Sequence, residues 1–295
     1  MVIFRGNNST FDFWKSPDAI RWNKVSELVV PGHNECPDFF ELSVENDPGV
    51  RKWVFLSGAG KWVQGDCAKY IVGRFDGERF TPEQESIVID GGRENYSTQL
   101  FSDAPDNRKI FVGWYSRSFG SVGYPGMPAN GQFRVPWELT LYKTQNGYRL
   151  RRLPVKELAS LHGKKHGWPE QKLGAGAEFK ADIESRELDI ETRIEPGKSG
   201  GFDLGLAGMK VAYDASAGKV NAFGRSIDVR PVDGVLTFRI LLDRTSVEMF
   251  INNGTCVMTG LFMPDDNAPA FSITATSAEL LIKGLTIYEM KSMWE

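Results

Sequence analysis

The sequence predicts an all-β protein in two parts, in which the first part is typical of a barrel, sandwich or propeller and the second of a β-sandwich. Three observations favour strands over helices. The 295 residues include 31 Gly, 15 Pro, 19 Phe and 8 Trp, a turn-rich and aromatic-rich composition. Apolar segments last only about four to seven residues, and Gly, Pro, Asn or Asp separate them. Helical periodicity is nowhere sustained over the roughly 10–12 residues that an α-helix requires.

Short strands separated by turns fill residues 1–155. The predicted strands cover residues 2–4, 11–14, 39–44, 53–56, 69–72, 86–89, 110–115 and 137–142. At roughly 50 residues per four-stranded blade, they supply about three blades, too few to close a propeller ring. We therefore expect the strands at 2–4 and 11–14 to lack a neighbour, to present apolar surface, and to cause self-association.

A linker is expected over residues 156–171, and a β-sandwich over residues 172–295. His162 and His166 are spaced as metal ligands on a helix would be, but interspersed glycines disfavour a helix there, so no metal site is predicted. In the sandwich region, apolar and polar residues alternate as in half-buried antiparallel strands. These strands are predicted at residues 187–194, 235–242, 246–251, 270–276 and 279–288.

Composition argues against several classes of function. The net charge is −3 and no Lys/Arg block stands out, so nucleic acid and anionic membranes are poor candidate partners. Three cysteines without paired spacing predict neither a disulfide framework nor a zinc cluster. No apolar run is long enough to span a bilayer, and the start of the chain lacks the apolar core of a signal peptide.

Five ordered segments resemble glycoside hydrolase family 32, the β-fructosidases (invertases, levanases and inulinases). Residues 33–42 contain the Glu-Cys-Pro-Asp run of the family's acid/base motif, and residues 70–80 resemble its Tyr-x-x-Gly-x-Phe-Asp-Gly-x-x-Phe segment. Residues 90–99 are similar to its Asp-x-Gly-x-Asp-Phe-Tyr-Ala-x-Gln segment. The resemblance is completed by the Gly-Trp at residues 113–114 with the Pro-x-Glu-Leu at 136–139, and by the Asp-Arg-Thr-Ser-Val-Glu-Met-Phe at 243–250.

The resemblance implies a five-bladed propeller followed by a sandwich, and a retaining hydrolase of β-fructosyl linkages without a cofactor. Glu35 matches the catalytic acid/base, although a lone glutamate beside a structural cysteine is more often a surface residue. Tyr96 and Trp114 are candidates to line the fructose pocket, or else belong to the propeller core. Asp90 either binds a sugar hydroxyl or caps the turn that follows it.

The sequence departs from the family pattern in two ways. Glu94 and Asn95 replace the usual Asp-Phe, Tyr115 replaces Met, and Trp137 replaces an Arg, removing a cation that would orient Glu138. In addition, neither the Trp-x-Asn-Asp-Pro-Asn-Gly run of the nucleophile nor the Arg-Asp-Pro run of the stabilising aspartate is present. We expect Met1 to fall within the third blade.

A retaining glycosidase needs two carboxyl groups. Asp38, Asp66, Asp90 and Glu94 are candidate substitutes on charge alone, with no spacing that places one opposite Glu35. Three hypotheses therefore remain. The chain is the C-terminal part of a β-fructosidase that needs the missing blades, a non-catalytic fructan-binding module or pseudoenzyme, or an interaction module that pairs through exposed strand edges. The sequence leaves open sucrose, levan or inulin as substrate, hydrolysis or transfer, and localisation, which is often secreted or periplasmic in the family.

Overall fold

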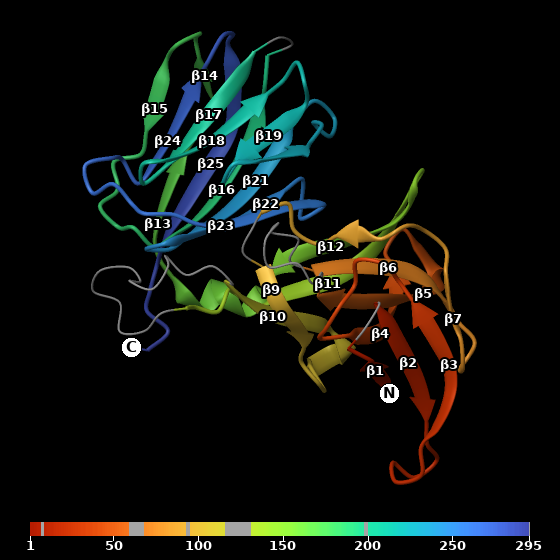
Figure 1. Cartoon of the computed structure of the whole chain (residues 1–295). Helices are drawn as coiled ribbons and strands as arrows, with labels where there is room; N and C mark the ends of the chain where they lie inside the picture. Colours follow the sequence, from red (N-terminus) through yellow and green to blue (C-terminus); the bar gives the residue numbers. More distant parts are fainter. Residues whose placement is uncertain (7–8, 59–67, 93–94, 116–130, 198–199, 295) are drawn as a thin grey trace. The chain divides into compact units, whose positions relative to one another are not determined.

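A computed structural model describes residues 1–6, 9–58, 68–92, 95–115, 131–197 and 200–294 (Figure 1). The chain divides into two compact units. The propeller unit holds residues 1–90, 94–116 and 131–155, and the sandwich unit holds residues 91–93, 117–130 and 156–295. The described residues are almost entirely β, with two short 3-10 helices, η1 (Pro105–Asn107) and η3 (Lys156–Leu161).

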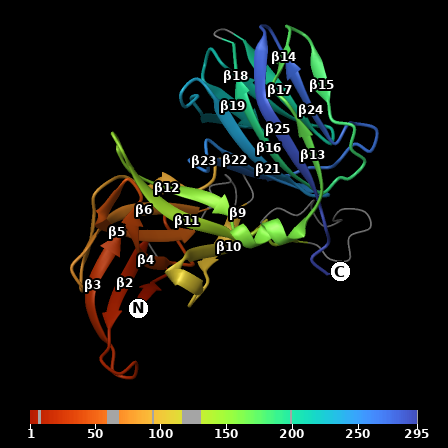
Figure 2. The ribbon, with the colours of Figure 1, turned by 180° about the vertical axis from the view of Figure 1, so that it is seen from behind.

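The propeller unit consists of antiparallel strands in three groups. The strands are β1 (Val2–Phe4), β2 (Thr10–Lys15), β3 (Asn23–Val29), β4 (Asp38–Val44), β5 (Asp47–Gly58), β6 (Ala68–Phe75), β7 (Phe80–Pro82), β8 (Ile87–Val88), β9 (Asn95–Leu100), β10 (Lys109–Tyr115), β11 (Trp137–Thr144) and β12 (Gly147–Pro154). β1, β2 and β3 form one sheet, while β4–β7 and β9–β12 form two antiparallel runs (Figure 2). A single parallel pair, Leu141 with Val44, joins the two runs. These groups are the three blades of a partial five-bladed propeller.

Aromatic rings fill the core that the first two strand groups share. Phe11 packs edge-on against Phe55 with ring centroids 4.8 Å apart, and Phe13 packs against Phe39 at 5.1 Å. Phe11 and Phe13 are only 0% and 3% exposed. The expectation that the strand at residues 11–14 lacks a neighbour and exposes apolar surface is therefore wrong.

The reason is a strand that the sequence analysis missed. β3 pairs with β2 over six residues, so that β2 lies between β1 and β3. Among the described residues β1 and β3 are the two edges of this sheet, and each pairs on one side with β2. β3 has the sequence Asn-Lys-Val-Ser-Glu-Leu-Val, in which polar residues interrupt the apolar ones. It was not predicted because it contains no clear apolar run.

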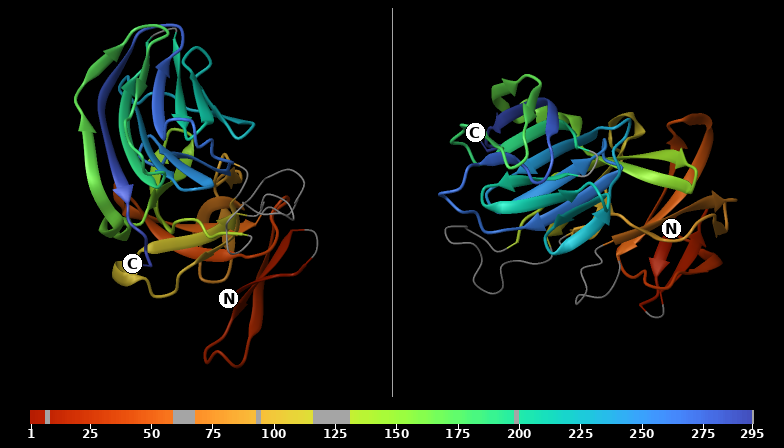
Figure 3. Two further views of the ribbon diagram at one scale, coloured as in Figure 1. Left: turned by 90° about the vertical axis from the view of Figure 1, so that its left-hand side faces the viewer. Right: turned by 90° about the horizontal axis from the view of Figure 1, so that it is seen from above.

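The sandwich unit consists of a seven-stranded and a six-stranded sheet that share one core (Figure 3). The first sheet contains β13 (His162–Trp168), β14 (Gln171–Leu173), β16 (Leu188–Glu195), β21 (Leu236–Leu242), β22 (Ser246–Ile251), β23 (Cys256–Leu261) and β25 (Leu280–Met290). The second contains β15 (Glu178–Lys180), β17 (Gly201–Leu206), β18 (Met209–Asp214), β19 (Lys219–Ala222), β20 (Arg225–Asp228) and β24 (Phe271–Ala275). The alternating pattern over residues 187–194 and 235–242 thus correctly predicted two paired strands, β16 and β21.

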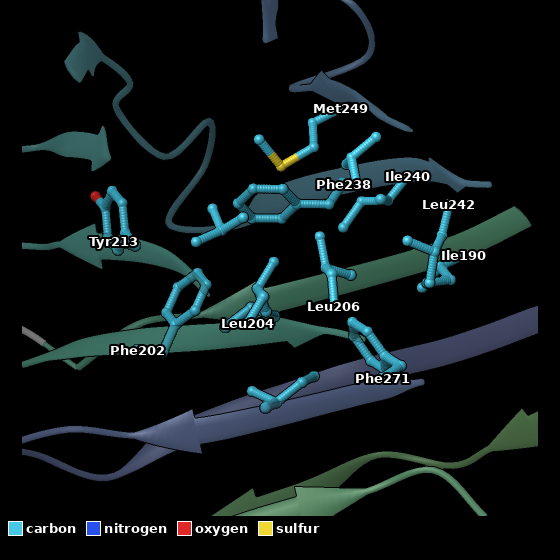
Figure 4. Close-up of a cluster of buried hydrophobic side chains, with 14 of the residues drawn as sticks. Ile190, Phe202, Leu204, Leu206, Tyr213, Phe238, Ile240, Leu242, Met249 and Phe271 are labelled. Atoms are coloured by element: carbon cyan, nitrogen blue, oxygen red, sulfur yellow. The ribbon is translucent and has the colours of Figure 1, made fainter. Parts of the chain in front are cut away.

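Side chains from the two sheets meet in the sandwich core (Figure 4). Phe202, Leu204 and Leu206 alternate along β17 and point toward Phe238 and Ile240 of β21. Each of these five side chains is at most 2% exposed. Period-two burial of this kind removes a continuous apolar face from water and fixes the register of both strands.

Residues 162–168, expected in a linker, form strand β13. It pairs with β25 at His162, Lys165, His166, Gly167 and Trp168. The glycines that argued against a helix are compatible with this extended strand, and Gly163 contacts backbone closely, since a Cβ there would meet the Glu289 carbonyl oxygen at 2.9 Å. No helix among the described residues has the length and apolar character needed to cross a membrane.

Candidate active site

Glu35 lies in the loop that leads into strand β4. Two backbone hydrogen bonds attach this loop to the end of β5. The Asn34 amide donates to the Gly58 carbonyl at 2.7 Å, and the Gly58 amide donates to the Glu35 carbonyl at 2.8 Å. A Cβ at Gly58 would lie 3.2 Å from the Glu35 carbonyl oxygen, so a glycine allows the close approach. The half-buried Glu35 carboxylate is thus carried on an anchored backbone.

The buried imidazole of His33 adds a second anchor to the same loop. Its Nδ1 lies 2.7 Å from Ser57 Oγ, and its Nε2 lies 2.7 Å from Ser86 Oγ. Burial, with a smaller contribution from the charge of Lys69, lowers the pKa of His33 to about 4. The ring is therefore neutral at pH 7 and links the loop to two other segments through hydrogen bonds.

Tyr96 of β9 contacts Glu35 directly. Its hydroxyl donates a hydrogen bond to Glu35 Oε1. Burial and the neighbouring Glu35 carboxylate both raise the pKa of Tyr96, so the phenol keeps its proton and remains a donor. The two residues are 61 positions apart in the sequence, and this contact brings two of the predicted site residues together.

Trp114 of β10 lies beside Tyr96. The two residues are Cα partners across β9 and β10, and their rings meet edge to face with centroids 6.1 Å apart. The register shifts between Val112 and Trp114, as at a β-bulge, and bulges redirect side chains next to active sites. Glu35, Tyr96 and Trp114 therefore form one contiguous cluster, which we call the Glu35 cluster.

Two further contacts join the Glu35 loop to β9, and the sequence analysis did not anticipate either. Cys36 Sγ lies 3.2 Å from Ser97 Oγ. Asp38 Oδ2 accepts a hydrogen bond from the Leu100 amide at 2.9 Å. Burial raises the pKa of Asp38 to about 6, and the bond from the Leu100 amide opposes that shift.

Of the other carboxylate candidates, Asp90 is described by the structure and two are not. Asp90 is 1% exposed and directly precedes Gly91, whose amide donates to the Val257 carbonyl at 2.8 Å. Its two suggested roles, sugar binding and turn capping, stay predictions. Asp66 and Glu94 fall outside the described residues.

Glu138 has a cation partner despite the tryptophan at position 137. Arg108 Nη2 lies 2.7 Å from Glu138 Oε2, and its Nε donates to the same oxygen at 2.9 Å. A second guanidinium, that of Arg134, lies 3.5 Å from the centroid of the buried Trp137 ring. The expected loss of an orienting cation is therefore compensated by Arg108, which is distant in sequence.

The paired histidines of β13 bind separate carboxylates. His162 Nε2 lies 2.9 Å from Asp189 Oδ2, and His166 Nε2 lies 2.7 Å from Glu289 Oε1. Within the described ranges, no group of three or more His, Cys, Asp or Glu side chains is arranged to hold a metal ion. The chemistry that the Glu35 cluster itself offers is proton transfer at a carboxyl group held by a phenol.

Solved structures share this fold. An exo-inulinase from Aspergillus awamori matches with a TM-score of 0.81 at 20% identity, over 99% of this chain and 64% of that one. A fructofuranosidase variant from Schwanniomyces occidentalis, complexed with fructosylnystose, matches with a TM-score of 0.83 at 20% identity, over 99% and 67%. At this identity the likeness shows the fold, a β-propeller followed by a β-sandwich.

Family models identify the chain. The model of the glycosyl hydrolases family 32 N-terminal domain matches residues 1–154, and that of the family's C-terminal domain matches residues 157–289. The chain belongs to glycosyl hydrolase family 32.

A levanase from Bacillus subtilis is 29% identical over all of this chain and 48% of its own length. A sucrose-6-phosphate hydrolase from Klebsiella pneumoniae is 26% identical over 85% of this chain and 52% of its own. The chain thus spans about half the length of these relatives.

Proposed function

We propose that the chain is the C-terminal part of a hydrolase of β-fructosyl linkages, in which Glu35 is the general acid/base. The observation that carries this proposal is the hydrogen bond from Tyr96 to Glu35 in a chain of this family. The relatives are named levanase and sucrose-6-phosphate hydrolase, which favours fructose-containing saccharides as the substrate class.

The geometry supports a proton-transfer role for Glu35. In a retaining mechanism, one carboxylic acid protonates the departing oxygen and then, as a carboxylate, activates the attacking water. Tyr96 binds Oε1 of Glu35, and we assign the proton transfer to the other oxygen, Oε2. A donated hydrogen bond also stabilises the carboxylate that forms once the proton has left. The half-buried Trp114 ring beside Tyr96 offers an apolar face to the sugar.

In this proposal the nucleophile comes from polypeptide beyond these 295 residues. A retaining glycosidase places its nucleophilic carboxylate about 5–5.5 Å from the acid/base. The family's nucleophile run is absent from the sequence, and the chain spans about half the length of its relatives. Strand β1, which among the described residues pairs only with β2, offers a free edge for the remaining blades to extend.

A non-catalytic fructan-binding module is the second candidate. It is favoured by one specific observation, that the Glu35 cluster is assembled in a sequence without the nucleophile run. In that case the cluster would bind saccharide and release no fructose.

Fructose release and saccharide binding together separate the two candidates. The chain alone is expected to release no fructose from sucrose, levan or inulin. Release should begin when the N-terminal half of the Bacillus subtilis levanase is supplied, either as a separate chain or as a fusion. Binding of fructosylnystose in calorimetry without release from any combination would establish the binding module. If the combined protein neither binds fructosylnystose nor releases fructose, both candidates are contradicted.

A further inference from the structure

Three contacts in register join the Glu35 loop to strand β9. They follow the same order along both segments: Glu35 with Tyr96, Cys36 with Ser97, and Asp38 with Leu100. These segments are not neighbours in the sheet, because β11 and β10 lie between β4 and β9 in the strand order. Each contact involves at least one side chain, so the sheet's backbone ladder alone does not hold the Glu35 loop against β9.

The middle contact joins two residues with unfavourable backbone conformations. Cys36 has φ of 54° and Ser97 has φ of 50°, in the left-handed region that non-glycine residues seldom adopt. Cys36 directly follows Glu35, and Ser97 directly follows Tyr96. Such conformations are disfavoured for residues with a Cβ and persist only where the surrounding structure holds them. The Glu35–Tyr96 contact therefore depends on neighbouring interactions that hold the backbone at Cys36 and at Ser97 in place.

Asp38 makes the interaction best suited to hold them. Its carboxylate oxygen Oδ2 accepts the Leu100 amide at 2.9 Å. Leu100 is the last residue of β9 and is Cα partner to Phe111 of β10. A carboxylate that accepts a backbone amide in a partly buried place makes a stronger bond than two neutral groups do.

We propose that Asp38 is a positioning residue, which keeps Tyr96 in hydrogen-bonding contact with Glu35 by binding the Leu100 amide of β9. Its value for catalysis rests on the proposed function, whereas the contact itself does not. Loss of the Asp38 acceptor should free β9 to move away from the Glu35 loop and let Cys36 and Ser97 relax. The Tyr96 hydroxyl would then lose its partner.

Carbon-13 NMR of ring-labelled tyrosine in the full chain tests this directly. The Tyr96 Cζ signal, assigned with Tyr96→Phe, reports whether the hydroxyl donates to a carboxylate, and Glu35→Ala gives its position without that partner. Asp38→Ala should move the signal toward the Glu35→Ala position and speed amide exchange at Leu100 by about tenfold or more. Asp38→Asn, which keeps an acceptor oxygen, should restore the wild-type signal.

Asp76→Ala is the matched control. Asp76 also accepts backbone amides, from Glu78 at 2.9 Å and Arg79 at 2.7 Å, but in the turn between β6 and β7. This variant should leave the Tyr96 signal unchanged. An Asp38→Ala protein that folds and keeps the wild-type Tyr96 signal would overturn the proposal.

If Asp38→Ala does not fold, the wild-type chain still decides the question. The Leu100 amide proton should titrate with a midpoint near pH 6, the pKa to which burial raises Asp38, and this titration should vanish in Asp38→Asn. A Leu100 signal that does not change with pH would overturn the contact.

In a fructose-releasing combined protein, Asp38→Ala should lower kcat and leave KM within about twofold of the wild-type value, and Asp38→Asn should recover most of the lost kcat. If the NMR result holds but no combination releases fructose, the proposed function fails and the positioning contact stands.

Discussion

Two titratable residues, the buried His33 and the partly buried Asp38, flank Glu35, and burial shifts their pKa values in opposite directions. It raises the pKa of Asp38 to about 6 and lowers that of His33 to about 4, because the charged form of either group loses solvation. Between about pH 4 and 6, Asp38 is thus protonated in the folded chain and ionised in the unfolded chain. Between about pH 4 and 6.5, His33 is neutral in the folded chain and protonated in the unfolded chain.

Because the two pKa shifts act in opposite directions over the same pH range, mutating the two residues should change the pH dependence of stability in opposite ways. The Asp38 contribution to the free energy of unfolding falls as pH rises from 4 to 6, and the His33 contribution rises over pH 4 to 6.5, each by at most about 3 kcal/mol. Relative to wild type, Asp38→Asn should therefore make stability rise more steeply with pH, and His33→Gln should make it rise less or fall. Urea unfolding at pH 4.5, 5.5 and 6.5 measures these slopes.

The exposed Asp103 provides the control for that experiment. Asp103→Asn should leave the pH slope as it is in the wild type. Equal slopes for wild type, Asp38→Asn and His33→Gln would contradict the assigned burial effects.

The sequence indicated which residues gather at the site, but not the contacts that hold them there. Glu35, Tyr96 and Trp114 were chosen from motif resemblance, and the structure places them in one cluster. The contacts of Asp38 with Leu100 and of Arg108 with Glu138 span 62 and 30 residues, and no local pattern signals either. Their existence depends on how strands from different parts of the chain are aligned.

At the level of elements, clean alternation was the reliable signal. β16 and β21 were predictable because their apolar residues recur at every second position and enter the core. The turn after β22 was predictable for another local reason, since Asn252, Asn253 and Gly254 all adopt positive φ. β9 was missed because its sequence, Asn-Tyr-Ser-Thr-Gln-Leu, is mostly polar, and β13 because it contains two glycines.

The pairing of β13 with β25 predicts where an autonomous sandwich segment begins. A segment of residues 156–295 should unfold in one cooperative transition, because it contains both sheets and their core. A segment of residues 172–295 lacks β13, so β25 loses a neighbour and Asp189 loses its His162 partner. It should unfold at a lower urea concentration or aggregate.

Circular dichroism during urea unfolding of both segments tests this prediction. Equal midpoints would mean that β13 adds nothing to the stability of the sandwich. Failure of the longer segment to unfold cooperatively would contradict its autonomy.

At the scale of the whole molecule, the propeller unit and the sandwich unit correspond to the two domains of the family. The propeller unit carries the proposed acid/base, and the sandwich unit has a separate apolar core. The proposed function takes the nucleophile from other polypeptide, and relatives of which this chain spans about half the length are consistent with that proposal. In the proposed function, the Glu35 cluster is therefore one half of an active site.

The most direct test of this account is the rate of fructose release by the combined protein carrying Glu35→Gln. Glutamine is nearly isosteric with glutamate but has no titratable proton, so kcat on levan or sucrose should fall by about 10²–10⁴-fold. Glu41→Gln provides the matched control, since Glu41 lies on strand β4 directly after the Glu35 loop, binds Arg51 at 2.7 Å, and should retain wild-type kcat. A Glu35→Gln protein that releases fructose within about twofold of the wild-type rate would contradict the acid/base role assigned to Glu35.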